Sequence, residues 1–446
     1  MNEAICAICT PYGSAAISII RCSGDNSINL VNNCFKGFNL NNALPNSIHY
    51  GHIIDNNEII DEVMVAVFKA PKSFTAEDSV EINCHGGIYV TNRVLRTLLK
   101  NGFRMAEPGE FSKRAFLNGR IDLVQAESIM DMVSAKNKLA LGIANNGISK
   151  KTSNMITTLK QEVLDILVDI EVNIDYPEYT DIPEIEYSNL NNRISTIIKK
   201  MENILEKSSG GKLIREGIKT VIVGKPNVGK SSLLNTLLDE EKAIVSDIEG
   251  TTRDYIEGFL NIGGITLNLI DTAGIRASSD EIEQIGVKRS LSKIDEADLV
   301  LVLLDNSKKL NDLDLEILEK TKNKKRIVIM NKIDLNKAND YNADIYMSIN
   351  DNKGIEELEN KILEILNLND FNVTDSNYLS NVRHISLLEK AKDSLNDAIK
   401  GIENMFEVDM ISIDIKNALD YLGEIVGESN TELVIDRLFQ RFCLGK

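Results

Sequence analysis

The hydrophobic pattern of the first 118 residues mixes two periods. Residues 17–20, 63–68 and 79–82 are short runs rich in β-branched side chains, whereas residues 89–99 repeat apolar positions at the spacing of a helix. Short β-branched runs are typical of strands, and a repeat of three to four residues is typical of an amphipathic helix. The pattern therefore predicts an N-terminal α+β domain over residues 1–118.

From about residue 119 the apolar positions recur every three or four residues, which predicts helices that pack along one face. Such repeats occupy residues 156–170, 194–205, 385–402 and 415–422. Two Pro and six acidic residues without Lys or Arg lie within residues 171–187, which favours a solvated acidic loop. The helical pattern is expected to end near Ser208–Gly211.

A different pattern separates these helical regions. Apolar runs alternate with helical stretches and lie at residues 220–223, 265–270, 299–304, 327–330 and 345–347. This alternation is the signature of a parallel sheet with crossover helices. The simplest organisation is a helical domain in two parts, residues 119–212 and 371–446, with an α/β domain of residues 213–370 inserted between them.

The composition narrows the class of protein. With 43% hydrophobic and 26% charged residues in a chain of 446, it is typical of a globular, multidomain protein. No window of 18 uninterrupted apolar residues occurs and the first residues lack the basic start of a secretion signal, so a cytoplasmic protein without a membrane partner is expected. The net charge of −17 repels phosphate backbones, so contact with nucleic acid is expected to be local or to come through a partner.

Six cysteines in this length exclude a disulfide scaffold. Cys6 and Cys9 form a C-x-x-C pair without a second pair at zinc-ligand spacing, so we interpret them as thiols of a first strand. Cys443 is fourth from the end, but Gly445 is not aliphatic and Lys446 is not an accepted last residue for prenylation. Cys443 is therefore either a redox-active or nucleophilic thiol or an inert one.

A nucleotide-binding motif follows the first apolar run of the inserted domain. Residues Gly224–Ser231 fit G-x-x-x-x-G-K-[ST] and lie between a predicted strand and a predicted helix. The backbone N–H groups of such a loop bind the α- and β-phosphates, Lys230 reaches the β- and γ-phosphates, and the Ser231 hydroxyl can ligate Mg²⁺. The alternative is that these residues form only a structural turn. The predicted strand before the motif and helix after it favour the phosphate-binding loop.

Three further motifs lie at the ends of predicted strands, where ligands bind in open α/β sheets. Asp271–Gly274 places a carboxylate for a water-mediated Mg²⁺ contact and a glycine N–H near the γ-phosphate. In Asn331–Asp334, the Asp carboxylate can accept hydrogen bonds from N1–H and the 2-amino group of guanine, and Lys332 can lie along the base. Ser348 is expected to close the base pocket. Together these motifs predict a Ras-like P-loop GTPase domain.

The catalytic residue is less evident. Ras-like enzymes place a Gln after D-x-x-G to orient water, but this position is Ile275, whose apolar side chain cannot do so. Glu281 and Glu283 in the following segment are the candidates. Upstream, Ser246–Asp254 is expected to be the first switch, with Thr252 as a Mg²⁺ ligand. The expected GTP contacts are Asn227, Val228, Gly229, Lys230, Ser231, Ser232, Ser246, Asp247, Ile248, Glu249, Gly250, Thr251, Thr252, Asp271, Thr272, Ala273, Gly274, Asn331, Lys332, Asp334 and Ser348.

Several motifs along the whole chain resemble those of the MnmE (TrmE) family of tRNA-modification GTPases. Beside the nucleotide motifs they are Ile19–Gly24, Ser73–Asp78, His85–Gly87, Pro108–Asn118 and Phe442–Lys446. The resemblance implies an N-terminal tetrahydrofolate-binding domain that forms a homodimer, a helical domain and an inserted GTPase domain. It also implies action with the FAD-dependent partner MnmG (GidA) to build an aminomethyl-type or carboxymethylaminomethyl group on C5 of the wobble uridine of certain tRNAs.

The resemblance further implies roles for single residues. A tetrahydrofolate derivative, 5-formyl or 5,10-methylene, supplies the one-carbon unit and would contact Arg21, Glu81, Arg120 and Lys446. Potassium would be held by Asn227, Ser246, Ile248 and Thr251, and Glu283 would orient the attacking water. The family's tail approaches the folate, which would place the thiol of Cys443 near the one-carbon unit. The tRNA would bind mainly through the partner.

Two other functions compete with this one. A GTP-dependent binding switch in ribosome or RNA assembly has a similar phosphate loop and an Ile after D-x-x-G, but it usually carries a basic RNA-binding module, and the flanking regions here give no basic cluster. A folate-dependent methyltransferase with a vestigial GTPase conflicts with the complete set of four nucleotide motifs. The sequence therefore favours an enzyme that couples GTP hydrolysis to tRNA modification.

Overall fold

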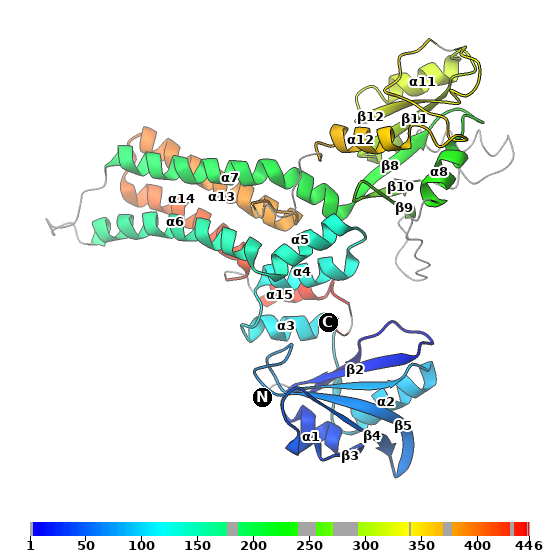
Figure 1. Ribbon diagram of the computed structural model, residues 1–446. Coiled ribbons are helices and arrows are strands. Elements are labelled where there is room, and N and C mark those ends of the chain that lie inside the picture. The colour runs from blue at the N-terminus through cyan, green and yellow to red at the C-terminus, as the bar shows by residue number, and fades with distance from the viewer. Residues whose placement is uncertain are drawn as a thin grey trace. The chain divides into compact units, whose positions relative to one another are not determined.

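The computed structural model describes residues 3–175, 186–239, 256–270, 293–338, 340–368, 377–428, 432–443 and 445. The chain forms two compact units, the first of residues 1–130 with 423–446 and the second of residues 131–422. Each unit contains a sheet together with helices, as Figure 1 shows, so the predicted multidomain α/β fold class is confirmed.

The N-terminal domain is built on one seven-stranded sheet. Its strands are β1 (Ile5–Ile8), β2 (Ile17–Ser23), β3 (Phe35–Gly37), β4 (Ser47–Asp55), β5 (Glu58–Phe68), β6 (Ser79–His85) and β7 (Arg104–Met105). Its helices are α1 (Ser27–Asn32), the 3-10 turn η1 (Leu40–Asn42), α2 (Ile88–Lys100) and α3 (Glu110–Leu117). The order is β3-β4-β5-β6-β2-β1-β7, and neighbours are antiparallel except for the parallel pair β1 and β7.

One face of this sheet forms the core of the N-terminal domain. Because strand side chains alternate between faces, buried residues of β2, β5 and β6 pack with α1 and α2 on one side, together with four cysteines that include Cys6. Burial raises the pKa of the Cys6 thiol to about 12, so Cys6 is a packing residue, as interpreted from the sequence. On the opposite face, the side chains of Ile48, Tyr50 and Met64 are exposed.

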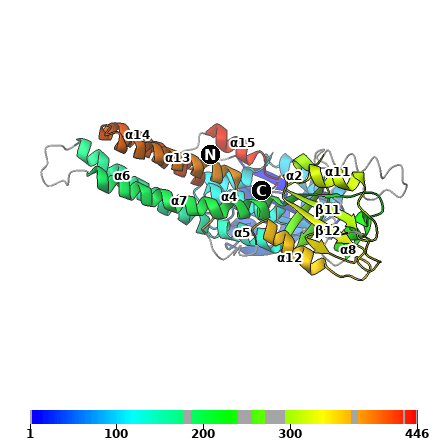
Figure 2. The same ribbon diagram turned by 90° about the horizontal axis from the view of Figure 1, so that it is seen from above.

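The helical part consists of α4 (Leu123–Ser134), α5 (Lys138–Ile148), α6 (Lys151–Asp175), α7 (Tyr187–Glu216), α13 (Val382–Glu403), α14 (Val408–Val426) and α15 (Glu432–Phe439). Figure 1 and Figure 2 both show α6 and α7 running alongside α13 and α14. The apolar repeats predicted for α6 and α7 are buried. Segments far apart in the sequence thus form one helical structure.

The prediction that the helical pattern ends near Ser208–Gly211 is wrong, because α7 continues to Glu216. These small residues allow the segment that precedes α13 to pack closely against α7. Ser208 Oγ accepts a hydrogen bond from the Leu379 N–H at 2.8 Å, and a Cβ at Gly211 would lie 2.9 Å from the Leu379 carbonyl O. Close packing therefore overrides the low helix propensity of glycine here.

The predicted acidic loop is also wrong at its start. Residues 171–175 are the last turn of α6, beyond the buried Ile170. Residues 176–185 lie outside the described residues, and α7 begins at Tyr187.

The inserted domain contains a second sheet. Its strands are β8 (Ile218–Val223), β9 (Ile256–Ile262), β10 (Ile265–Ile270), β11 (Leu299–Asp305), β12 (Arg326–Asn331) and β13 (Ile345–Tyr346). Its helices are α8 (Lys230–Asp239), the 3-10 turn η2 (Ile294–Glu296), α11 (Asp312–Lys320) and α12 (Ile355–Ile365). The order β13-β12-β11-β8-β10-β9 places β8, which leads into the phosphate loop, inside the sheet.

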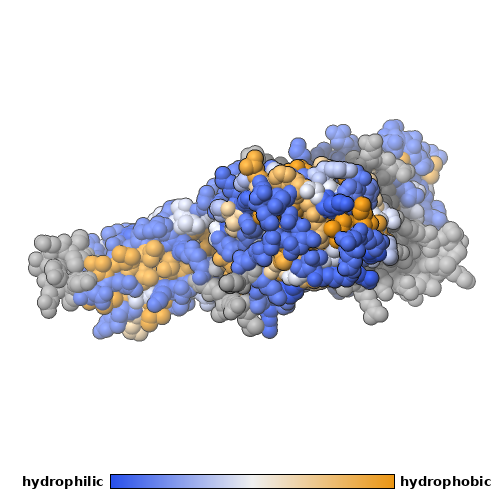
Figure 3. All heavy atoms as spheres, turned by 90° about the horizontal axis from the view of Figure 1, so that it is seen from below, coloured by the Kyte–Doolittle hydropathy of each residue, from blue (hydrophilic) through white to orange (hydrophobic). Residues whose placement is uncertain are grey.

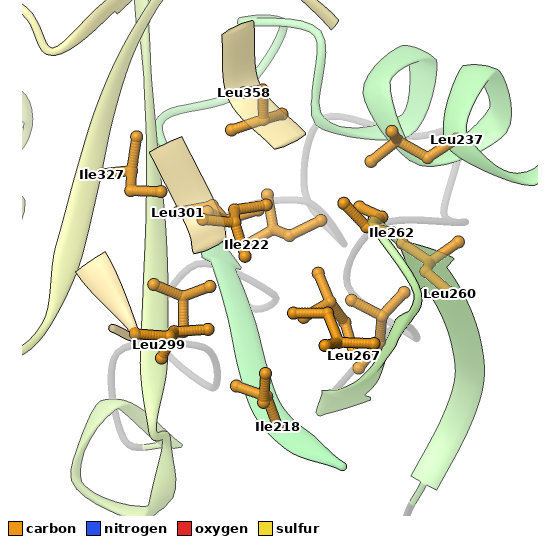
Figure 4. Packing of buried hydrophobic residues seen from close by; sticks show 14 of the residues in the cluster. Ile218, Ile222, Leu237, Leu260, Ile262, Leu267, Leu299, Leu301, Ile327 and Leu358 are labelled. Atoms are coloured by element: carbon orange, nitrogen blue, oxygen red, sulfur yellow. The ribbon is translucent and has the colours of Figure 1, made fainter. Parts of the chain in front are cut away.

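Both faces of this sheet are buried, as expected for strands joined by crossover helices. Leu301 of β11 faces one cluster and Val302 faces the other, where Ile317 of α11 packs. Figure 4 shows Leu237 of α8 and Leu358 of α12 beside the strand side chains of the Leu301 cluster. The same cluster includes residues of α5 and α7, so the inserted domain and the helical part share a core.

The sheet is mixed rather than parallel as predicted, because β9 is antiparallel to β10. Strand β9 is not predicted from the hydrophobic pattern. Gly263 and Gly264 form the turn between the two strands with φ of +57° and +83°. Two glycines between apolar runs are a hairpin signal, and a two-residue turn joins only antiparallel strands.

The surface seen in Figure 3 is largely hydrophilic, with hydrophobic side chains gathered in patches. Among the described helices, none is long and apolar enough to cross a membrane. On the N-terminal sheet, Ile17, Ile48, Tyr50 and Met64 are 57%, 61%, 62% and 51% exposed.

Candidate functional site

The phosphate loop lies between β8 and α8, where the motif predicts it. Two of its glycines have close neighbours. A Cβ at Gly224 would lie 2.6 Å from the Leu303 carbonyl O, and a Cβ at Gly229 would lie 2.4 Å from Asn331 Nδ2. Gly229 also has φ +104°, where other side chains are strained. The loop therefore follows a path open only to glycine at these positions, and α8 begins with Lys230 directly after it.

The loop surrounds the ammonium group of Lys230. Lys230 Nζ donates to the carbonyl O of Gly224 at 3.1 Å and to that of Lys225 at 2.8 Å. Lys230 is only 6% exposed, so its charge is concentrated inside the loop, where this motif binds phosphates. Ser231 and Ser232 follow in the first turn of α8 and are exposed.

The base-recognition motif at the end of β12 is hydrogen-bonded to the phosphate loop. Asn331 Nδ2 donates to the Val228 carbonyl O at 2.8 Å. Lys332 Nζ donates to the Asn227 carbonyl O at 2.7 Å, and Asn227 has φ +63°. Asn tolerates this left-handed conformation better than most residues. The two motifs are therefore joined by hydrogen bonds.

Asp334 and Ser348 lie together beside this structure. Ser348 is fully buried, and its Oγ donates to Asp334 Oδ1 at 3.0 Å. A carboxylate has about four lone-pair sites, so Asp334 keeps acceptors for a guanine edge while Ser348 orients it. The role of Ser348 in closing the base pocket stays a prediction.

Asp305 is a residue of this site that sequence reasoning missed. It ends β11 and is 2% exposed, and its Oδ2 lies 2.9 Å from Lys332 Nζ. Burial alone would raise the pKa of this carboxyl, but hydrogen bonds from Ser307 and Lys332 outweigh burial and lower the pKa. Asp305 therefore stays charged and fixes the Lys332 ammonium. The available signal was its place at the carboxyl end of a predicted strand.

The loop is also anchored from α11. Lys225 Nζ lies 2.6 Å from Asp314 Oδ2, and the Asp314 side chain is fully buried. Asp314 forms the capping box of α11 with Asn311, so the same carboxylate starts a helix and holds the loop. Sequence reasoning missed this pair because its members are 89 residues apart.

The remaining predicted residues of the nucleotide and metal sites lie outside the described ranges. They are Ser246, Asp247, Ile248, Glu249, Gly250, Thr251, Thr252, Asp271, Thr272, Ala273, Gly274 and Glu283, and their roles stay predictions. Of the expected metal ligands, Asn227 and Ser231 are described. Within the described part of the chain, no group of three or more His, Cys, Asp and Glu side chains could hold a metal ion.

A second cluster lies in the N-terminal domain. Arg21 of β2 and Glu81 of β6 are register partners, and Arg21 Nε donates to Glu81 Oε1 at 2.9 Å. Their side chains are 23% and 26% exposed, so a ligand can reach the pair. The guanidinium groups of Arg21 and Arg120 lie 5.2 Å and 5.4 Å from the centroid of the Phe74 ring. Arg21, Glu81 and Arg120 are therefore brought together around Phe74, which sequence reasoning did not single out.

The C-terminal segment reaches this cluster. The Gly445 carbonyl O accepts hydrogen bonds from Arg21 Nη1 at 3.4 Å and from Cys9 Sγ at 3.3 Å. The Cys443 carbonyl O accepts from the Gly109 N–H at 3.3 Å, and Cys443 is exposed. The interpretation of Cys9 as a thiol of the first strand is wrong, because it follows β1 and contacts the tail. The last residue, Lys446, lies outside the described residues.

Two solved structures are similar to parts of the chain. The G domain of the T. maritima FeoB iron transporter is 29% identical and covers 33% of this chain and 98% of its own, with a TM-score of 0.23. Aquifex aeolicus Era is 26% identical and covers 40% of this chain and 66% of its own, with a TM-score of 0.24.

Family and relative comparisons extend over the whole chain. Residues 4–120 match the family described as GTP-binding protein TrmE N-terminus, and residues 123–443 match the MnmE helical domain. The tRNA modification GTPase MnmE of Acholeplasma laidlawii (strain PG-8A) is 52% identical over 445 residues, covering 100% of this chain and 99% of that protein. That of Streptococcus thermophilus (strain CNRZ 1066) is 49% identical over 449 residues, covering 100% and 98%. The chain therefore belongs to the MnmE family of tRNA modification GTPases.

Proposed function

We propose that the protein hydrolyses GTP and, with the FAD-dependent partner MnmG, carries out the folate-dependent addition of an aminomethyl-type or carboxymethylaminomethyl group at C5 of the wobble uridine of certain tRNAs. The observation that carries the proposal is the presence of two built sites in one chain. One joins the phosphate loop to Asp334, and the other joins Arg21 and Glu81 to the C-terminal tail. A GTP-dependent switch alone would need only the first.

The nucleotide site accounts for GTP binding and hydrolysis. Lys230 and the first N–H groups of α8 bind the phosphates, while Asp334 selects guanine. Glu283 orients the attacking water in place of the Gln that other GTPases use. Ser231 with Thr252 would hold Mg²⁺, and Asn227, Ser246, Ile248 and Thr251 would hold K⁺. Bound there, the two ions supply positive charge to the phosphates. The exposed hydroxyl of Ser231 is a hard oxygen donor that suits Mg²⁺.

The Arg21 cluster fits a tetrahydrofolate derivative. The ligand carries carboxylates on its glutamate part, which guanidinium groups bind well. Its pterin ring has N–H groups that can donate hydrogen bonds to the Glu81 carboxylate. Both Arg21 and Glu81 are partly exposed, and Arg120 is exposed beside them. When bound, the folate supplies the one-carbon unit. The exposed Cys443 thiol and Lys446 would lie next to it on the tail.

A homodimer is part of the proposal. The open face of the N-terminal sheet carries Ile48, Tyr50 and Met64, and Tyr50 is the register partner of Met64. Contiguous exposed apolar side chains mark interaction surfaces, and a second copy of the same face provides a self-complementary partner. Sedimentation velocity at micromolar concentration measures this state.

The tRNA contact belongs mainly to the partner in this proposal. The net charge of −17 opposes a broad nucleic-acid surface on this chain. The proposed complex with the FAD protein therefore brings the tRNA to the folate and the tail.

The test is nucleoside analysis of total tRNA from cells that lack the protein. We expect the wobble-uridine modification to be absent, to return with the wild-type chain, and to stay absent with Arg21→Ala or Lys230→Ala. Arg93→Ala is the matched control, because Arg93 makes an exposed ion pair with Glu58 in the same domain as Arg21. Normal tRNA nucleosides with defective ribosome assembly would instead support the GTP-dependent switch.

A further inference from the structure

The ring of Phe74 carries two guanidinium groups. Arg21 lies 5.2 Å and Arg120 lies 5.4 Å from the ring centroid, both within the roughly 6 Å over which a cation is attracted to an aromatic face. Two like charges held at one ring oppose each other. Their common placement therefore depends on what attracts both of them, and the Phe74 ring does so.

The two arginines depend on this ring to different degrees. Arg21 is also held by Glu81 at 2.9 Å, by the Gly445 carbonyl O at 3.4 Å and by the Phe111 ring at 5.7 Å. Arg120 is exposed, and among the residues that the structure describes it has no carboxylate partner. The position of the Arg120 guanidinium therefore depends most on Phe74.

Phe74 lies in a loop that hydrogen bonds hold in place. Its neighbour Thr75 is fully buried, and Thr75 Oγ1 lies 2.6 Å from Ser23 Oγ. Asn118 Nδ2 donates to the Thr75 carbonyl O at 2.7 Å, which ties the loop to the segment that carries Arg120. The backbone beside Phe74 therefore cannot move away without breaking these hydrogen bonds, and a buried polar group is costly to leave unpaired.

The Glu77 side of the loop is fastened as well. Glu77 is 8% exposed and pairs with Arg114 of α3 at 3.2 Å, and Ser73 Oγ donates to the Glu77 carbonyl O at 2.5 Å. The loop is therefore held from β2, from α3 and from within itself. A rigid support of this kind is what an aromatic residue needs in order to position other side chains.

We infer that Phe74 is a positioning residue of the proposed folate site. It holds the guanidinium groups of Arg21 and Arg120 together, so that the pair meets the carboxylates of the ligand without being rearranged. This inference rests on the proposed function for the identity of the ligand. The placement of the two arginines by the ring does not depend on that identity.

The first experiment is a calorimetric titration of the full-length protein with 5-formyltetrahydrofolate. Phe74→Leu keeps an apolar side chain but removes the π face, and Phe74→Tyr keeps the π face. We expect Kd to rise about tenfold in Phe74→Leu, because two cation–π contacts of about 0.5–1 kcal/mol each are lost. In Phe74→Tyr we expect Kd to stay within about twofold. Potassium-stimulated GTP hydrolysis should match the wild type in both, and Tm measures any packing lost against the buried cluster of Ile5 and Phe111.

Phe38→Leu is the matched control, because Phe38 is a partly exposed aromatic residue that stacks on His49 in the same domain. It should leave Kd unchanged. Wild-type affinity in Phe74→Leu would overturn the inference, and so would equal losses in Phe74→Leu and Phe74→Tyr.

A second experiment separates this inference from the proposed function. Wild-type protein that binds no folate would contradict the folate site but not the positioning role. The Nε–Hε NMR signals of Arg21 and Arg120, assigned with Arg→Lys variants, report ring placement without any ligand. We expect Phe74→Leu to move the Arg120 signal to the position of a free side chain and to move the Arg21 signal less. Unchanged signals for both arginines would overturn the positioning role whether or not folate binds.

Discussion

Lys332 Nζ lies 2.9 Å from Asp305 Oδ2, and the same ammonium group donates to the Asn227 carbonyl O at 2.7 Å. A buried carboxylate at the end of one strand thus fixes a lysine at the end of the next, and the lysine fixes the phosphate loop. The base-recognition motif and the phosphate loop are therefore joined through Lys332, and Asp305 holds this lysine in place.

Asp305→Asn should weaken GTP and GDP binding together. The substitution removes the charge that holds Lys332, and a hydrogen bond to a charged group contributes about 1.5–3 kcal/mol, so we expect Kd to rise at least about tenfold for both nucleotides. Fluorescent-nucleotide titration measures this. Asp351→Asn, which removes a carboxylate of an exposed pair 3.9 Å from Lys353, is the control and should bind as wild type. Equal affinities of the two variants would contradict the role of Asp305.

Asp334→Asn should change the preferred base from guanine to xanthine. An amide can donate to the 2-oxo group of xanthine but meets the donors of guanine with its own N–H groups. Competition between GTP and xanthosine triphosphate for the purified variant measures this preference. Ser348→Ala removes only the hydroxyl that orients Asp334, so it should weaken GTP binding without changing the preference. Continued preference for GTP in Asp334→Asn would refute the pocket assignment.

Glu283→Ala should lose most GTP turnover while it keeps GTP affinity. Ile275 cannot orient water, so removal of the proposed water-orienting carboxylate should lower kcat by about 10² or more. Glu281→Ala is the control at a neighbouring carboxylate. If Glu281→Ala is inactive and Glu283→Ala is active, the assignment along this segment is wrong.

Cys443→Ser should abolish tRNA modification and leave GTP hydrolysis and Tm near wild type. The thiol is exposed, so its replacement removes little packing, while Gly445, two residues further along the tail, contacts Arg21. Modification, hydrolysis and Tm are measured on the same preparations. Cys9→Ser keeps a donor to the Gly445 carbonyl O and is the control thiol. Normal modification by Cys443→Ser would make this cysteine chemically inert, and loss of GTP hydrolysis would make the tail structural.

Glu110→Gln should lower stability at neutral pH and change its pH dependence. Burial alone would raise the pKa of Glu110, but hydrogen bonds from Arg104, the Glu107 N–H and Arg114 lower it from 4.5 to about 2. The lowered pKa stabilises the fold above about pH 4.5, and this contribution is lost as pH falls toward about 2. At about 1.4 kcal/mol per pKa unit it is at most about 3.5 kcal/mol, and solvent screening makes it smaller.

Urea titrations of wild type and Glu110→Gln between neutral pH and about pH 3 measure this contribution. The difference between the two proteins should be largest at neutral pH and should shrink in acid. Glu107→Gln is the control, because Glu107 is exposed and meets Glu110 through its backbone N–H. A difference that stays constant with pH would contradict the lowered pKa.

Local sequence patterns predicted the parts of the site whose residues are neighbours in the chain. Gly224–Ser231 fixes its own conformation through glycines and a following helix, so the motif was sufficient. Asp305 and Asp314 were missed because their partners are distant in sequence and contact arises only when strands become adjacent. The same limit applies to Phe74, whose role depends on two arginines from separate segments.

The helices and strands were predicted where the apolar periodicity is strong. They were missed where a glycine can either end an element or lie inside one. Gly263 and Gly264 mark a hairpin turn, and the strand before them was not predicted. Gly211 is a residue type typical of a helix end, but it lies within α7. It is glycine there because a side chain would collide with the Leu379 carbonyl O. Sequence alone does not distinguish a glycine that ends a helix from one that admits a neighbour.

The contact between Gly211 and Leu379 also bears on how such a chain can evolve. Helix α7 leaves the helical part five residues after Gly211, about 8 Å along the helix at 1.5 Å per residue, and the chain returns at Leu379. The two ends of the inserted domain are thus close to each other on their host. A module with adjoining ends can be gained or exchanged by recombination as one surface loop is exchanged for another, because the helices that receive it need not move. The architecture therefore lets a GTPase domain be added to a helical domain at a single place in its surface.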